Sequence, residues 1–154
     1  MLRVTKLTDY ATVVLTVLAS ADEAVLSANG LAERAGLEAP TVAKVLKPLA
    51  QAGLVQAFRG ATGGYRLARP AAEISLVEIV EAMEGPLAMT ECSVHDGHCG
   101  IEHSCGARAN WRRINDVVAD ALRRVTLADM ALPVPTPEPR KTIPVSLSGH
   151  WEPR

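Results

Sequence analysis

The 154-residue sequence predicts a mainly α-helical fold in which a helix-turn-helix is followed by a two-stranded wing. Apolar residues make up 48% of the chain but aromatic residues only 3%, so the core must rest on aliphatic side chains. Helix-start and helix-end signals recur over the first 85 residues, and a glycine-rich segment separates two short strand patterns. All three cysteines then fall in one segment, so the expected fold also contains a cysteine-bearing loop. Beyond this loop, the sequence predicts a long C-terminal dimerisation helix.

Helical periodicity predicts three helices within the first fifty residues. The first helix opens with the capping residue Thr8. Ser27 caps a short second helix, which Gly36 can end in a left-handed conformation. The third helix begins near Pro40. Its apolar residues fall at i, i+3, i+4 and i+7, and they are Val42, Val45, Leu46 and Leu49. Two short helices joined through one glycine turn form a helix-turn-helix.

The opposite face of the third helix is polar and suits the reading of bases in a DNA major groove. Its residues are Thr41, Lys44, Lys47 and Gln51, and Ser27 joins them as a candidate DNA contact. A solvated surface is the plainer interpretation of the same pattern. Pro48 is expected to bend or break this helix, since an interior proline loses one backbone hydrogen bond, so DNA contacts should concentrate in the N-terminal half.

Residues 54–59 and 65–69 are predicted strands, and residues 60–64 are the hairpin loop between them. Arg59 at the base of this wing is a candidate for a minor groove, and Arg66 or Arg69 for a phosphate. The loop residues Thr62, Gly63 and Gly64 are further candidate DNA contacts. A generic surface hairpin would also explain the arginines, but a hairpin directly after a helix-turn-helix favours DNA binding.

Two further helices are expected beyond the wing. Ser75 and Glu78 have the spacing of a capping box, and Gly85-Pro86 ends the helix that follows. The later helix has an apolar face formed by Trp111, Ile114, Val118, Ala121, Leu122 and Val125. So long a helix on so small a domain favours homodimerisation through this face, although packing against the first helix is an alternative. The predicted organisation is a DNA-binding domain at 1–85, a loop at 86–106, a dimerisation helix at 107–132 and a proline-rich, disordered tail at 133–154.

Charge and hydropathy restrict the class of protein. Net charge is −1, but residues 1–70 carry eight Lys/Arg against five Asp/Glu, whereas residues 71–110 carry one against seven. A basic end and an acidic middle indicate separate working surfaces. No apolar run approaches the length of a membrane span, and the N-terminus lacks signal-peptide features. We therefore expect a cytoplasmic protein with reduced thiols, no membrane partner and no enzymatic activity.

The cysteine loop favours a metal centre. Cys92, Cys99 and Cys105 have the spacing Cys-x6-Cys-x5-Cys, whereas structural zinc sites usually contain a close Cys-x2-4-Cys pair. Iron–sulfur clusters accept three thiolates and one other ligand. A catalytic cysteine has little support, because Glu91, Asp96 and Glu102 disfavour a thiolate.

Several motifs together resemble the IscR-like iron–sulfur winged-helix regulators. They are the wing Arg59-Gly-x-x-Gly-Gly-Tyr65, the helix start Ile74-Ser-Leu-x-Glu-Ile79, the three loop cysteines, Trp111-x-x-Ile114 and Thr126-Leu-Ala-Asp129. Within that family, Leu7-Thr-Asp-Tyr10 and Leu87-Ala-Met-Thr-Glu-Cys92 look most like the regulators of the SUF iron–sulfur assembly operon. The resemblance implies a homodimeric repressor whose [2Fe-2S] or [4Fe-4S] cluster sets its affinity for double-stranded promoter DNA.

The resemblance leaves two candidates for the fourth cluster ligand. Relatives often place a histidine three residues after the last cysteine, but that position here is Arg108, which cannot ligate iron. The nitric-oxide-sensing branch takes an aspartate from the first helix of the partner subunit, and the matching residue is Asp9. Asp9 is therefore preferred to His103, although an aspartate in a first helical turn also stabilises the helix dipole. A zinc- or thiol-based redox regulator without a cluster is the alternative function.

Overall fold

The computed structural model describes residues 4–60, 62–90 and 105–132. Its helices are α1 Lys6–Ala19, α2 Ala28–Ala35, α3 Ala39–Gln51, α4 Leu76–Glu84, α5 Arg108–Arg124 and α6 Leu127–Ala131, with a short 3-10 helix, η1, at Ala71–Glu73. Strands β1 Val55–Phe58 and β2 Gly64–Leu67 form one antiparallel hairpin. The predicted mainly helical, winged fold is confirmed. Within the described ranges, none of the helices has the length and apolar character that crossing a membrane requires.

Helix α1 begins earlier than the sequence predicted. Its N-cap is Thr5, whose side chain accepts from the Thr8 backbone N–H at 3.3 Å. Thr8 is therefore inside the helix and only 1% exposed, so its predicted role as the cap is wrong. The apolar residues predicted at helical spacing are all buried, and they are Ala11, Val14, Leu15 and Leu18. The hydroxyl of Thr5, about one turn upstream, caps the helix instead.

Helices α2 and α3 form the predicted helix-turn-helix. Ser27 caps α2, and Gly36 ends it at φ 64° and ψ 32°, a left-handed conformation that suits glycine. Of the bend or break expected at Pro48, the break does not occur, because α3 continues to Gln51 and the Pro48 carbonyl accepts from the Ala52 N–H at 2.9 Å. Burial of Leu49 one residue later compensates for the single backbone bond that proline removes.

The hairpin pairs Gln56 with Arg66 and Phe58 with Gly64. Because side chains alternate across a strand, Val55 faces the core while Gln56 and Phe58 face outward. A third short segment adjoins β2, since Leu26 and Tyr65 exchange backbone hydrogen bonds of 2.9 and 2.8 Å. This bridge ties the wing to the residue before the Ser27 cap.

Helix α5 and helix α6 are separate, where the sequence predicted one long helix. Val125 leaves the helix at φ −89° and ψ 123°, and Thr126 caps α6 through its own capping box with Asp129. Backbone bonds of 2.8 Å from Leu76 to Val125 and from Leu127 to Ile74 fasten this break to the start of α4. Leu127 is completely buried, so α6 packs on α1 within the N-terminal body.

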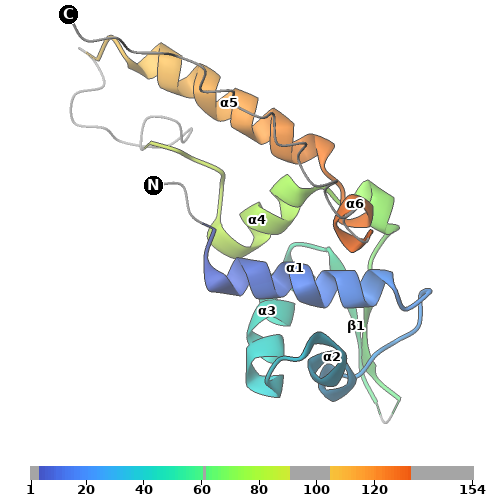
Figure 1. Ribbon diagram of the computed structural model, residues 1–154. Helices are drawn as coiled ribbons and strands as arrows, with labels where there is room; N and C mark the ends of the chain where they lie inside the picture. The colour runs from blue at the N-terminus through green and yellow to red at the C-terminus, as the bar shows by residue number, and fades with distance from the viewer. Residues whose placement is uncertain (1–3, 61, 91–104, 133–154) are drawn as a thin grey trace, which may run out of the picture.

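Figure 1 displays the resulting arrangement of the elements. Helices α2 and α3 and the tip of the hairpin lie together at one end, α1 crosses the middle, and α5 extends as an arm at the other end. Helix α5 packs against α4. The candidate DNA-reading elements and the arm are therefore separated by the body of α1 and α4.

Candidate DNA interface and cysteine loop

The polar face predicted for α3 is on the surface. Lys44, Lys47 and Gln51 are exposed and Thr41 is half-buried, while the four apolar residues of the opposite face are at most 1% exposed. Burial of that face fixes the rotation of the helix about its axis, so the lysines must point outward. The arrangement presents two cations on the helix that a major groove would receive.

Ser27 has a structural role and remains exposed. Its hydroxyl oxygen accepts from the Gly30 N–H at 3.1 Å and caps α2. The N-terminus of α2 therefore carries an exposed hydroxyl beside backbone N–H groups, which is a suitable environment for a phosphate oxygen.

The hairpin separates its predicted contacts into exposed and packed positions. Arg59 and Thr62 are exposed, and Gly63 is half-buried. Gly64 is buried, and a Cβ placed there would lie 2.4 Å from the Leu26 carbonyl oxygen. Gly64 therefore has a packing role, because its missing side chain allows the close approach of the Leu26 backbone, and its contact with DNA stays a prediction.

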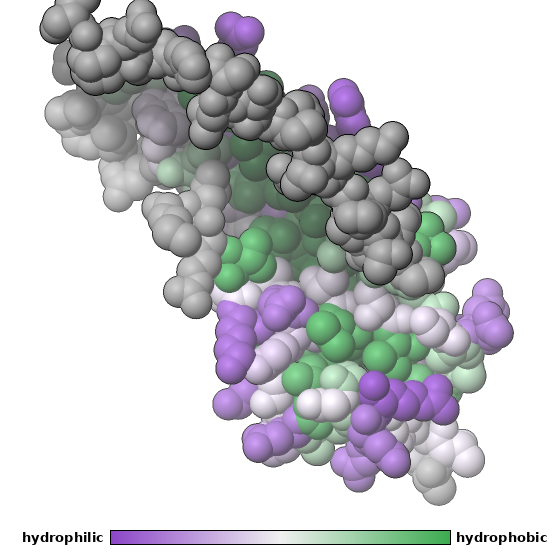
Figure 2. Space-filling model, in the orientation of Figure 1, coloured by the Kyte–Doolittle hydropathy of each residue, from purple (hydrophilic) through white to green (hydrophobic). Residues whose placement is uncertain are grey.

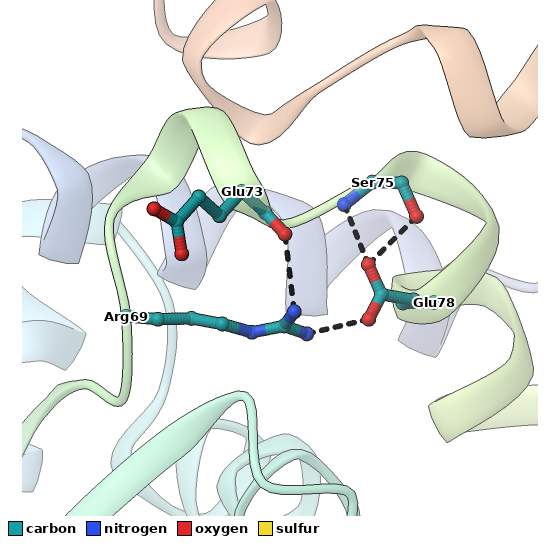
Figure 3. A network of polar contacts seen from close by, with 4 residues as sticks. All are labelled: Arg69, Glu73, Ser75 and Glu78. Carbon is teal, nitrogen blue, oxygen red and sulfur yellow. Dashed lines mark hydrogen bonds and ion pairs between the residues drawn. The ribbon is translucent and has the colours of Figure 1, made fainter.

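The two other arginines of the wing have different roles. Arg66 lies on the outward face, where its guanidinium stacks 5.1 Å from the centre of the Phe58 ring and donates to Gln56 Oε1 at 3.0 Å. Arg69 instead donates to the Glu78 carboxylate and, at 3.1 Å, to the Glu73 carbonyl oxygen, as Figure 3 shows. Arg69 joins the end of the wing to α4, so Arg66 is the better candidate for a phosphate.

The candidate cluster ligands fall partly within the described residues. Asp9 is exposed in the first turn of α1, and Cys105 is half-buried just before α5. Cys92, Cys99 and His103 lie outside the described residues, as do His95 and His98. Within the described ranges, no three histidine, cysteine or acidic residues gather at one point.

Sequence reasoning missed a polar junction between α1 and the end of α4. The Thr8 hydroxyl donates to Glu84 Oε1 at 2.6 Å, and the Thr5 N–H donates to the same oxygen at 2.8 Å. These bonds lower the pKa of Glu84 from its ordinary value, the Thr8 hydroxyl contributing most. Nothing in local periodicity indicates this junction, because its partners are 76 and 79 residues apart.

A second junction joins the following segment to α5. The Met89 N–H donates to Asn115 Oδ1 at 3.1 Å, and Asn115 is 9% exposed. A sequence signal was present here, since Asn115 interrupts the apolar stripe between Trp111 and Val118 at helical spacing. The end of α4 is thus held at Glu84 by α1, and the start of the loop is held at Met89 by α5.

The arm carries an exposed apolar face. Trp111, Ile114 and Val117 are 38%, 43% and 63% exposed. Asn115 is the only residue of α5 that is buried. Figure 2 shows hydrophobic residues gathered between the arm and the N-terminal body, with hydrophilic residues along the outer edge of the arm. A helix with an uncovered apolar face is typical of a protein interface.

Comparison with known proteins connects these surfaces to one family. Residues 4–132 match the Rrf2 family, which is described as an iron-dependent transcriptional regulator. Protein aau3 of Rhizobium meliloti (strain 1021) is 35% identical over 130 residues, covering 84% of each chain. The structure of CymR (YrzC), the global cysteine regulator of B. subtilis, is similar with a TM-score of 0.65 at 30% identity, covering 85% of this chain and 97% of that one. T. potens IscR is similar with a TM-score of 0.60 at 30% identity, covering 84% and 85%.

Proposed function

The chain belongs to the Rrf2 family of DNA-binding transcriptional regulators, and from this premise we propose that it is a homodimeric repressor that controls SUF iron–sulfur assembly genes through an iron–sulfur cluster. The observation that carries the proposal is the placement of Asp9 and Cys105. Both are candidate ligands: Asp9 follows Thr8, which bonds Glu84, and Cys105 lies just before α5, the helix whose Asn115 bonds Met89.

The donor set fits an iron–sulfur cluster. Three thiols in a reducing compartment, Cys92, Cys99 and Cys105, are the ligands that such clusters prefer, and a carboxylate is a reasonable fourth. The exposed position of Asp9 fits a ligand supplied to a partner subunit. An exposed carboxylate is free to bind a group of the partner, because no buried contact within its own chain has to be broken. A cluster bound by these residues would link the segments that carry them, and its loss or oxidation would break or weaken that link.

DNA binding is assigned to one end of the molecule. Lys44, Lys47, Thr41 and Gln51 on α3 would lie in a major groove, and Arg59 with Thr62 and Gly63 of the wing in the adjacent minor groove. Ser27 at the start of α2 would contact a phosphate. Thr41, Lys47, Gln51 and Arg59 would carry the base discrimination, whereas Lys44 and Ser27 would contact phosphates, which carry no sequence information.

Dimerisation is assigned to α5. Its face of Trp111, Ile114 and Val117 would be covered by the same face of a second copy, which gives a two-fold axis and two matching half-sites. In the proposed organisation residues 1–85 bind DNA and 86–106 hold the cluster; within 107–132, α5 dimerises while α6 packs on α1; and the tail at 133–154 is dispensable.

One observation favours a second candidate function. The similarity to CymR, a global cysteine regulator, supports a thiol-based or zinc-based regulator that holds no cluster. Cys105 is half-buried and forms no disulfide within the described part of the chain, so its thiol is a candidate for that chemistry.

Purification without oxygen distinguishes the two functions. The cluster proposal predicts a brown protein with visible charge-transfer absorption and iron and inorganic sulfide in roughly equal amounts. Zinc without sulfide would overturn it in favour of a zinc site. A colourless, metal-free protein whose DNA affinity changes on thiol oxidation would establish the thiol-based function instead.

A further inference from the structure

The described residues contain two buried polar side chains, Thr8 and Asn115. They come from different helices, α1 and α5, and lie 107 positions apart in the sequence. Both hydrogen-bond to one short segment, residues 84–90, which we name the strap. The strap leads from the end of α4 toward Cys92. The strap therefore consists of the last residue of α4, Glu84, and the connecting residues 85–90, and each buried polar group bonds one end of it.

The α1 end of the strap is held by a carboxylate. Glu84 Oε1 accepts from the Thr8 hydroxyl at 2.6 Å and from the Thr5 N–H at 2.8 Å. The Thr5 and Thr8 hydroxyl oxygens are themselves 3.0 Å apart. Because the Thr8 proton is given to the carboxylate, the Thr5 hydroxyl must be the donor in that contact. Thr8 is therefore both donor and acceptor in a chain that ends on the strap.

The α5 end of the strap is held by an amide. Asn115 Oδ1 accepts from the Met89 N–H at 3.1 Å. Between the two ends, the Leu87 N–H points to Glu81 Oε1 at 3.4 Å. A short segment with polar attachments at both ends has few ways to move independently of the two helices.

Filling the helix stripe does not by itself explain these two polar side chains, because an apolar side chain of the same shape would occupy the stripe equally well. Their hydrogen bonds offset the cost of burying the polar groups and leave a modest net contribution to stability. What a satisfied buried polar group does supply is a defined partner, because any other position of the strap would leave the group unpaired. Their chemistry therefore suits positioning rather than burial.

We propose that Thr8 and Asn115 are positioning residues that fix the strap to α1 and α5, so that a change of state in the cysteine loop is passed to the DNA-binding helices. This route lies within one subunit and does not require a ligand from the partner. Helix α1 packs directly against α2 and α3, so a displaced strap acts on the helix that supports the recognition helix. Coupling of this kind needs a contact that differs between the cluster-loaded and cluster-free states. In this proposal the contacts that differ are the Thr8–Glu84 and Met89–Asn115 hydrogen bonds.

The inference rests on the proposed function, and the test keeps the two apart. Operator affinity is measured for cluster-loaded and cluster-free protein, and the ratio of the two constants is the readout. The variants are Thr8→Val and Asn115→Ala, each of which removes one strap bond. Both are expected to retain the cluster-free operator affinity within about twofold while the ratio falls toward one. Amide hydrogen exchange should accelerate at Thr5 in the first variant and at Met89 in the second.

Matched controls separate positioning from loss of packing. Thr16→Val removes a hydroxyl from the same helix, but that hydroxyl donates to the Val13 carbonyl within α1. Asn110→Ala changes an exposed asparagine of α5. Both controls should keep the wild-type ratio, and Thr8→Ser, which keeps the hydroxyl, should restore it.

The outcomes are distinct. A wild-type ratio of one refutes the proposed function and the coupling with it. A clear wild-type ratio that both strap variants retain overturns the inference and leaves the proposed function standing. If Thr8→Val fails to fold, Asn115→Ala and the exchange rate of Met89 still decide the question.

Discussion

Arg69 and Ser75 bind the same carboxylate from opposite sides, that of Glu78 (Figure 3). The Ser75 N–H and hydroxyl donate to Oε2 at 2.9 and 2.7 Å, and Arg69 donates to Oε1. One residue thereby completes the capping box of α4 and anchors the end of the wing. The end of the hairpin is therefore tied to the cap of α4.

The first prediction concerns acid stability. Burial raises the pKa of Glu78, but the hydrogen bonds from Arg69 and Ser75 outweigh it and lower the pKa to about 2 from 4.5. The unfolded chain then binds more protons between these values, so the stabilisation is present above pH 4.5 and is lost as pH falls toward 2. Because the side chain is 37% exposed, we expect about 1 kcal/mol at pH 7 after allowing for solvent screening.

Urea unfolding of wild type and Glu78→Gln between pH 3 and 7 checks this prediction. The difference in unfolding free energy should shrink as pH falls. Glu73→Gln is the control, because Glu73 takes part in the network through its backbone carbonyl and its side chain is exposed. A difference independent of pH would show that the carboxylate charge has no role in the junction.

The second prediction separates Arg66 from Arg69. Arg66→Leu should leave the unfolding midpoint nearly unchanged and weaken binding to all DNA, with the salt slope reduced by about 0.9 per lost phosphate contact. Arg69→Leu should lower the unfolding free energy, since it leaves Glu78 without its cation. Thermal unfolding and salt titrations of DNA binding measure both effects. The reverse pattern would assign the phosphate contact to Arg69.

The third prediction compares Lys44 with Arg59. If Arg59 reads a narrow minor groove, Arg59→Ala should cost about 1–3 kcal/mol on the operator and much less on random DNA. Lys44→Ala should weaken both DNAs alike, because a lysine on a phosphate carries no sequence information. Arg123→Ala on α5 provides a matched loss of charge and should change neither affinity. Equal losses on the two DNAs for both variants would contradict the assignment of Arg59.

The fourth prediction tests the apolar face of the arm. Ile114→Glu should convert the dimer into a folded monomer, because burying an unpaired carboxylate at an apolar interface is costly. Ala109→Glu introduces the same charge on the hydrophilic side of α5, beside Arg112 and Arg113, and should remain dimeric. Light scattering after size exclusion measures the mass of each. Retention of the dimer by Ile114→Glu would place the interface elsewhere.

The fifth prediction distinguishes the fourth cluster ligands. Asp9→Ala should leave the fold intact, because the side chain is exposed, and should make the cluster labile or change its visible spectrum. His103→Ala should do neither. Absorption spectra and the rate of iron release record the effect. If only His103→Ala alters the spectrum, the ligand set lies within one subunit and the role of Asp9 is refuted.

The sequence by itself determined the elements that local chemistry specifies. Gly36 ends α2 because few other residues adopt its left-handed conformation, and Ser75 with Glu78 starts α4 because their spacing closes a capping box. The outward, polar face of α3 followed from periodicity, since the four buried apolar residues leave only one side for the lysines. These features depend on residues within one or two helical turns, which a linear pattern records.

Only the tertiary structure decided which residues distant in the sequence form hydrogen bonds and ion pairs with one another. In the sequence Thr8 has the features of a helix cap, but in the structure its hydroxyl donates to Glu84. Arg66 and Arg69 are equivalent in the sequence, but in the structure only Arg69 binds the Glu78 carboxylate. The break after α5 likewise follows from backbone bonds between residues 74–76 and 125–127. The physical reason is the same in each case: a hydrogen-bond partner is chosen by proximity in space, and chain folding, not sequence periodicity, sets that proximity.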